Sequence, residues 1–161
     1  MKKGIKFFLL TIIFVCIFAS CGKESRTRLP EKFSLTVKGI EFSVGDDADV
    51  VTKSLGEENS FSSAPSCAGI GADELYVYNG FKITAHRAEG KAKITAIEIT
   101  NDTLPTVEGV YIGSSEESVR EKYGEGSPFS GGVEYRSDVC RLRFFITDGR
   151  VTGIKYLENG T

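Results

Sequence analysis

The sequence predicts an α+β fold of two tandem repeats, each a short helix followed by three or four antiparallel strands. Residues 44–57 align with residues 112–125, and both segments contain an apolar residue and Gly, a polar stretch, Val, and a closing Gly-Glu. Alternating apolar residues and turn dipeptides follow each segment, as is typical of strands. We therefore expect a first repeat at 33–104 and a second at 105–161.

Each aligned segment has the features of one short helix. Asp46 and Ser114 are placed to accept a backbone hydrogen bond at the helix N-terminus, with an acidic residue three positions later. The apolar residues that follow at helical spacing are Ala48, Val51 and Leu55 in the first segment and Val119 and Tyr123 in the second. Gly56 and Gly124 are expected to end the helices, because glycine adopts the left-handed conformation without strain.

Strands are predicted around two-residue turns. Asn79-Gly80 and Asp148-Gly149 each separate two alternating runs, and dipeptides of this kind favour tight hairpins. The predicted strands span residues 33–37, 40–44, 74–78, 81–85, 93–100, 133–136, 139–147 and 150–157. Residues 101–107, with Pro105, are interpreted as the joint between the repeats.

The N-terminus has the features of an export signal. Three lysines precede an apolar run at 7–19, which is too short to span a bilayer. Phe18-Ala19-Ser20-Cys21 then resembles the lipobox of bacterial lipoprotein signals. This resemblance implies a signal peptide at 1–20, a lipid (including palmitate) on Cys21, and a cell-membrane protein outside the cytoplasm. An ordinary signal peptide cut elsewhere is the alternative, and the polar residues 21–32 are interpreted as a flexible tether.

Composition limits the classes of partner. The chain has 20 basic and 22 acidic residues, and removal of the signal leaves 17 and 22. This balance argues against nucleic acid as the main partner. The predicted partners are the membrane, through the lipid anchor, and a protein or cell-envelope component.

Two cysteines, Cys67 and Cys140, remain besides the lipidated one, and an exported protein can join them as a disulfide. The alternative for Cys140 is a buried thiol, since it shares a strand face with Leu142 and Phe144. No His/Cys cluster has zinc spacing and no cofactor motif is recognised, so neither metal nor cofactor is expected. A thiol hydrolase that uses Cys67 and His86 remains an alternative function, although a solvated turn explains His86 as well.

Aromatic and basic side chains are predicted on the open side of two strands. They are Tyr76 and Tyr78 in the first repeat and Arg141, Arg143 and Phe145 in the second. This composition is typical of protein-binding surfaces. The alternative is that these residues only solvate the outer side of a half-buried sheet.

The two aligned segments, with the closing run at 144–154, resemble the repeat fold of the β-lactamase inhibitor protein family and of small outer-membrane assembly lipoproteins. The resemblance implies helices packed on antiparallel sheets that form a concave binding surface. Those inhibitors carry a disulfide in each repeat and an inhibitory loop, which this sequence lacks, so β-lactamase inhibition is not expected. The sequence therefore predicts a non-catalytic, lipid-anchored binding or scaffold protein, with an envelope-assembly lipoprotein as the alternative.

Overall fold

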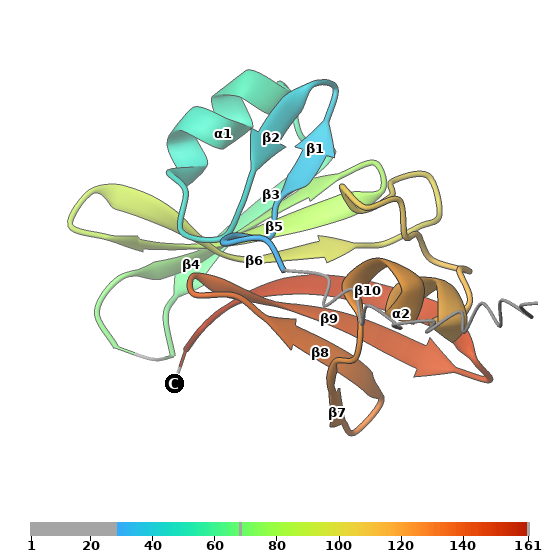
Figure 1. The fold of residues 1–161 in the computed structure, drawn as a ribbon. Coiled ribbons are helices and arrows are strands. Elements are labelled where there is room, and N and C mark those ends of the chain that lie inside the picture. Colours follow the sequence, from blue (N-terminus) through green and yellow to red (C-terminus); the bar gives the residue numbers. More distant parts are fainter. Residues whose placement is uncertain (1–28, 68, 161) are drawn as a thin grey trace, which may run out of the picture.

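The computed structural model describes residues 29–67 and 69–160. Within this part, ten strands and two short helices make the chain mostly β (Figure 1). Eight of the strands form one antiparallel sheet in the order β3-β4-β5-β6-β10-β9-β8-β7, and β1 and β2 form a separate hairpin.

The helices are α1 (Ala48–Leu55) and α2 (Glu116–Tyr123). The strands are β1 (Leu35–Val37), β2 (Ile40–Phe42), β3 (Ser60–Pro65), β4 (Ala72–Tyr78), β5 (Phe81–Ala88), β6 (Lys91–Ile99), β7 (Ser127–Phe129), β8 (Gly132–Arg136), β9 (Cys140–Thr147) and β10 (Arg150–Glu158).

The predicted fold class, two tandem α+β repeats, is wrong. Strands dominate the chain, and β6 pairs directly with β10 from Ile99 opposite Ile154 to Ala96 opposite Leu157. Strands from both halves of the chain therefore belong to one continuous sheet and not to two helix-plus-strand units. The local patterns in the sequence specify helices and hairpins, whereas the pairing of β6 with β10 is a long-range contact that no local pattern encodes.

The first predicted helix is confirmed, but it begins one residue later than expected. The side chain of Asp47, not Asp46, accepts hydrogen bonds from the backbone N–H groups of Asp49 and Val50. Asp46 accepts instead from the backbone N–H of Ser43 at 2.8 Å and closes the preceding turn. The cap and the turn thus use two successive aspartates, which explains why the sequence left the choice between them ambiguous.

The second helix repeats this arrangement. Ser115 caps α2 by accepting from the backbone N–H of Ser118, while Ser114 accepts from the backbone N–H of Tyr111 at 3.1 Å. Gly124 ends the helix with a φ of 76°, as predicted from its conformational freedom.

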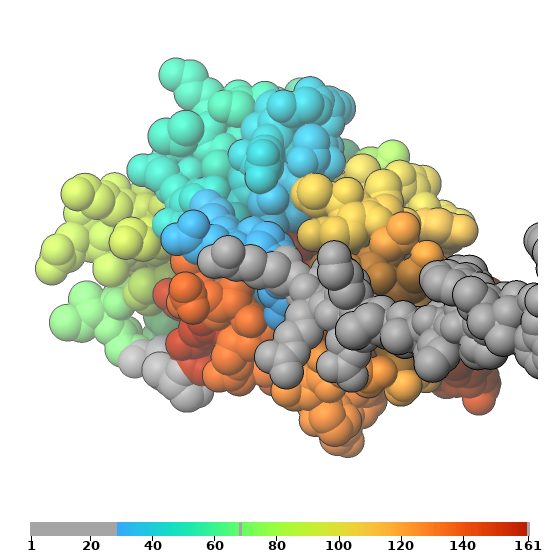
Figure 2. Space-filling model, viewed as in Figure 1, coloured from blue at the N-terminus to red at the C-terminus, as the bar shows by residue number. Residues whose placement is uncertain are grey.

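The core lies on one face of the sheet, beneath α1, α2 and the β1–β2 hairpin (Figure 1). Strand register aligns one row of buried side chains across six strands: Tyr76, Ile83, Ile97, Tyr156, Leu142 and Tyr135. Figure 2 shows how the covering layer fills the view on this side, with α1 and β1–β2 projecting above the first half of the sheet. We call the opposite side, which these elements leave uncovered, the open face.

Candidate functional site

The open face carries a row of charged side chains that crosses five neighbouring strands. Register places Lys82, Glu98, Lys155, Arg143 and Glu134 next to one another, in that order, from β5 to β8. The Lys155 ammonium lies 3.0 Å from the Glu98 carboxylate. Directly opposed side chains on one sheet face interact, so this row forms a continuous polar strip over the apolar core.

Glu134 is the centre of a group of arginines that we call the arginine cluster, comprising Arg136, Arg141 and Arg143. The Glu134 carboxylate accepts from Arg136 Nη2 at 2.9 Å and from Arg143 Nε at 2.6 Å. The Nη1 atom of Arg141 lies 3.8 Å from the same carboxylate. Glu134 is 8% exposed, so the three guanidinium groups lie around a nearly buried anion.

The arginines keep Glu134 ionised. Burial raises the pKa of this carboxyl group, but the hydrogen bonds from Arg136 and Arg143 and the charges of Arg143 and Arg141 lower it more strongly. The resulting pKa lies below the usual value of 4.5, so Glu134 is an anion at neutral pH.

Two phenylalanines border the arginine cluster. The rings of Phe129 and Phe145 meet edge to face with centroids 5.3 Å apart. The guanidinium carbon of Arg143 lies 4.9 Å from the centre of the Phe129 ring, and the Lys155 ammonium lies 5.9 Å from that of Phe145. These distances fit cation–π contacts, which hold the charged groups against an apolar surface.

Of the predicted binding residues, the structure brings Arg141, Arg143 and Phe145 together on the open face. Their alternation with buried Cys140, Leu142 and Phe144 is as predicted. The sequence interpretation missed Glu134 and Arg136. A signal for them was present, because a hairpin between 133–136 and 139–147 that turns at Ser137 places Glu134 opposite Arg143.

The expectation that Tyr76 and Tyr78 lie on the open side of their strand is wrong. Both are buried, at 7% and 9% exposure, and face the core. The Tyr76 hydroxyl donates to Glu74 at 2.9 Å, and burial, followed by this carboxylate, raises the pKa of Tyr76 to about 12. Tyr78 stacks on Phe81 with centroids 4.8 Å apart. Leu75 and Val77 take the half-buried positions on the other side, which the alternation alone did not decide.

The disulfide considered for Cys67 and Cys140 is not formed, and both are free thiols. Cys140 points into the core, where its thiol donates to the carbonyl oxygen of Phe33. Cys67 is exposed in the loop between β3 and β4. The buried thiol, the alternative drawn from the sequence for Cys140, is confirmed. Cys21, the predicted lipid attachment residue, lies outside the described residues.

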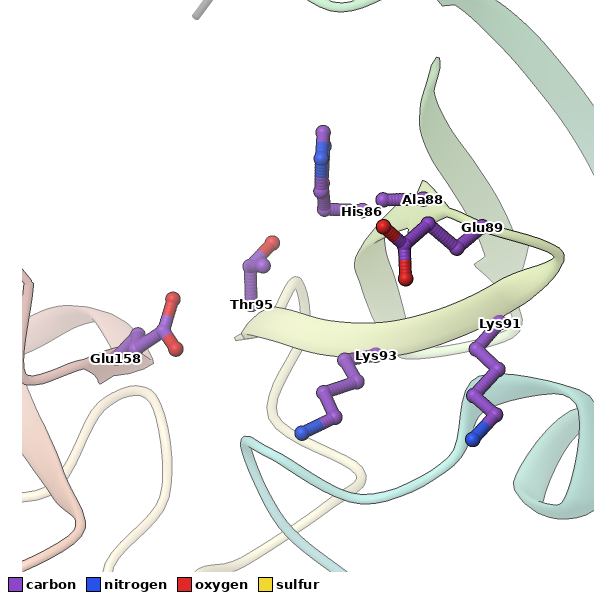
Figure 3. A pocket seen from close by; sticks show the side chains of 7 residues that line it. All are labelled: His86, Ala88, Glu89, Lys91, Lys93, Thr95 and Glu158. Carbon is purple, nitrogen blue, oxygen red and sulfur yellow. The ribbon is translucent and has the colours of Figure 1, made fainter. Parts of the chain in front are cut away.

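His86 lines an open pocket of about 400 Å³ beside the β5–β6 hairpin. Figure 3 shows the remaining lining residues around this space: Ala88, Glu89, Lys91, Lys93, Thr95 and Glu158. The Nδ1 atom of His86 lies 2.9 Å from the Asp73 carboxylate. The hydrogen bonds to His86, then to Ser66, lower the pKa of Asp73. Cys67 is not one of the residues that line the pocket, so the pocket does not pair the thiol and imidazole of the hydrolase alternative.

Among residues 29–67 and 69–160, no group of three or more His, Cys, Asp or Glu side chains is arranged to hold a metal ion. Neither helix in this part of the chain has the length and apolar character needed to cross a membrane.

No protein-family model and no curated protein matches the sequence. Two solved structures share a partial likeness with the chain. One is an extracellular protein containing a SCP domain from Bacillus anthracis, with 17% identity and a TM-score of 0.42. The other is a cysteine-rich secretory protein from Staphylococcus aureus, with 11% identity and a TM-score of 0.40. Each match covers 72% of this chain and 44% of the other protein, so the chain spans less than half their length.

The resemblance to the β-lactamase inhibitor family and to outer-membrane assembly lipoproteins is therefore corrected. The matching structures are SCP-domain and cysteine-rich secretory proteins, and the chain itself is mostly sheet. The resemblance rested on two short segments that encode a capped helix with a glycine end, and this local feature does not specify a family. Both matching proteins are described as exported, and export is also what the N-terminal segment predicts.

Proposed function

We propose that this protein is an extracytoplasmic binding protein, anchored to the cell membrane through Cys21, that holds a protein partner on the open face of its sheet. The observation that carries the proposal is the convergence of the arginine cluster with Phe129 and Phe145 on the one sheet face that no element covers. Arginine and aromatic side chains contribute most of the binding energy in many protein interfaces.

The geometry of the open face supports binding. Its side chains are partly exposed and already oriented by one another, so little conformational freedom is lost when a partner docks. The opposite face is occupied by α1, α2 and β1–β2, which leaves the open face as the broad side of the sheet available to a partner.

The anchor is tested by metabolic labelling with an alkyne-bearing palmitate analogue. We expect label on the full chain and none on a Cys21→Ser variant, which should also leave the membrane fraction. Label that persists in the variant, or an unlabelled wild type, would remove the anchor from the proposal.

The binding surface is tested by placing a photo-cross-linking amino acid at single positions in the full chain in cells. Leu157 lies on the open face opposite Arg141, whereas Val50 lies on α1 and is 63% exposed. We expect a discrete cross-linked species from position 157 and not from position 50. The absence of any species from position 157, or the same species from both positions, would contradict binding through the open face.

A further inference from the structure

The arginine cluster has a surplus of positive charge that the rest of the described surface does not share. Three guanidinium groups lie around the single carboxylate of Glu134. The whole chain has the opposite balance, with a formal net charge of −2. The cluster is thus a basic site on an acidic protein.

Two other arginines show the contrast. Arg87 is held between two carboxylates, those of Asp49 and Glu74, and the hydrogen bonds to them raise its pKa. Arg120 has Glu116 at 2.7 Å and Glu125 at 3.8 Å. Each of these arginines has two anionic neighbours, whereas the three in the cluster share one. The cluster therefore has unused capacity to bind anions.

The guanidinium groups of the cluster are already fixed in place. Arg141 donates from Nε and Nη2 to the backbone carbonyl oxygen of Glu158 at 3.1 and 2.9 Å. Arg143 is fixed by Glu134 on one side and by the Phe129 ring on the other. Within the described residues, the Nη atoms of Arg143 have no hydrogen-bond acceptor closer than the limits of a normal bond. A guanidinium presents five donors, so most of those in the cluster are free for a ligand.

We infer that the arginine cluster is a carboxylate-binding site, and that the partner presents Asp or Glu side chains to it. This inference rests on the proposed function and names the partner's chemistry. Arginine binds a carboxylate through two parallel N–H···O bonds, which makes the pairing directional as well as charged. The adjacent rings of Phe129 and Phe145 suit apolar side chains between the acidic ones. The occupant is thus an acidic, partly apolar segment of a protein.

Binding of acidic peptides to the purified full chain in detergent tests this inference. The probe is an array of peptides of about ten residues that alternate Glu with Leu or Phe, each matched by a version with Gln in place of Glu. Charge-assisted hydrogen bonds contribute roughly 1.5–3 kcal/mol, so the best Glu peptides should bind about 10- to 100-fold more tightly than their Gln versions. Binding should weaken as salt is raised from about 50 to about 300 mM.

Matched variants locate the binding. Arg136→Gln with Arg141→Gln keeps the Arg143–Glu134 pair, so the fold should remain, and thermal unfolding checks this. The double variant should lose about tenfold in affinity for the Glu peptides, whereas Arg120→Gln on α2 should bind as the wild type does. If the double variant unfolds, the single variant Arg136→Gln is used, since that side chain is 64% exposed.

Three results would overturn the inference: equal binding of Glu and Gln peptides, no binding of any acidic peptide, or equal loss in Arg120→Gln. Stronger binding of polyphosphate than of every Glu peptide would also overturn it, because charge density would then govern recognition. In each case a cross-link from position 157 would still support the proposed function, so the two failures are distinguishable.

Discussion

The thiol of Cys140 on β9 donates a hydrogen bond to the carbonyl oxygen of Phe33, with sulfur and oxygen 3.6 Å apart. The same carbonyl accepts from the Ser43 hydroxyl at 2.6 Å, and the Phe33 ring packs edge to face on Tyr123 of α2. Residues before β1 are therefore fastened to the core beside both halves of the sheet.

This contact makes the two thiols chemically unequal. Because Cys67 is exposed and Cys140 is buried, N-ethylmaleimide should modify Cys67 in the folded protein and Cys140 only after denaturation. Peptide mapping with light reagent before denaturation and isotopically heavy reagent afterwards measures both. Heavy label on Cys67, light label on Cys140, or a linked peptide containing both cysteines would contradict the free, unequal thiols.

The N-terminal cap of α1 should stabilise the fold through a single side chain. Asp47→Ala removes the acceptor for the backbone N–H groups of Asp49 and Val50 and should lower the free energy of unfolding by about 1 kcal/mol. Asp47→Asn is the matched control, since asparagine caps helices about as well as aspartate. Urea unfolding of both variants decides the point, and an equal loss in Asp47→Asn would show that charge and not capping is responsible.

Backbone packing at the start of β8 depends on glycine. A Cβ atom at Gly132 would lie 1.9 Å from the carbonyl oxygen of Phe144, which is backbone and cannot move aside. Gly132→Ala should therefore lower the free energy of unfolding by at least about 2 kcal/mol. Gly160→Ala is the control, because a Cβ there meets nothing within 4 Å, and it should change stability by less than about 0.5 kcal/mol. Similar unfolding midpoints for the two variants would contradict the packing argument.

Local elements of the fold could be predicted from the sequence. The helices follow from caps, apolar spacing and closing glycines, and the hairpins at Asn79-Gly80 and Asp148-Gly149 follow from turn chemistry. On the open face, Arg141, Arg143 and Phe145 followed from alternation with an unmistakably apolar set. In each case a few neighbouring residues determine the structure.

Other features depend on contacts that no short segment encodes. Strand β3, Ser60–Pro65, is exposed along its whole length and has no apolar alternation, so nothing in its sequence marks a strand. Tyr76 and Leu75 are both amphipathic enough to face either side, and only packing against Phe61 and Ile83 selects the tyrosine for the core. Glu134 became visible as a site residue only once β8 and β9 were in register.

The pH dependence of stability should reveal the arginine cluster. The cluster lowers the pKa of Glu134 in the folded protein below the usual 4.5 of the unfolded chain. A group with a depressed folded pKa stabilises the fold above its unfolded pKa, and this contribution is lost as pH falls through the folded pKa. Glu134→Gln should therefore be less stable than the wild type at neutral pH, by about 1–3 kcal/mol. The difference should shrink below about pH 4, where the wild-type carboxyl group also becomes neutral.

Urea unfolding at a series of pH values measures this difference. Asp49 and Asp73 also have lowered pKa values, because of hydrogen bonds to Arg87 and to His86 respectively, and they titrate in both proteins. Their contributions cancel when the two stability curves are subtracted, which leaves Glu134 and its three arginines. A difference that stays constant from neutral to acid pH would mean that the arginines do not stabilise the ionised carboxylate. The cluster would then be held by packing alone, and its free donors would have no electrostatic preference for a carboxylate.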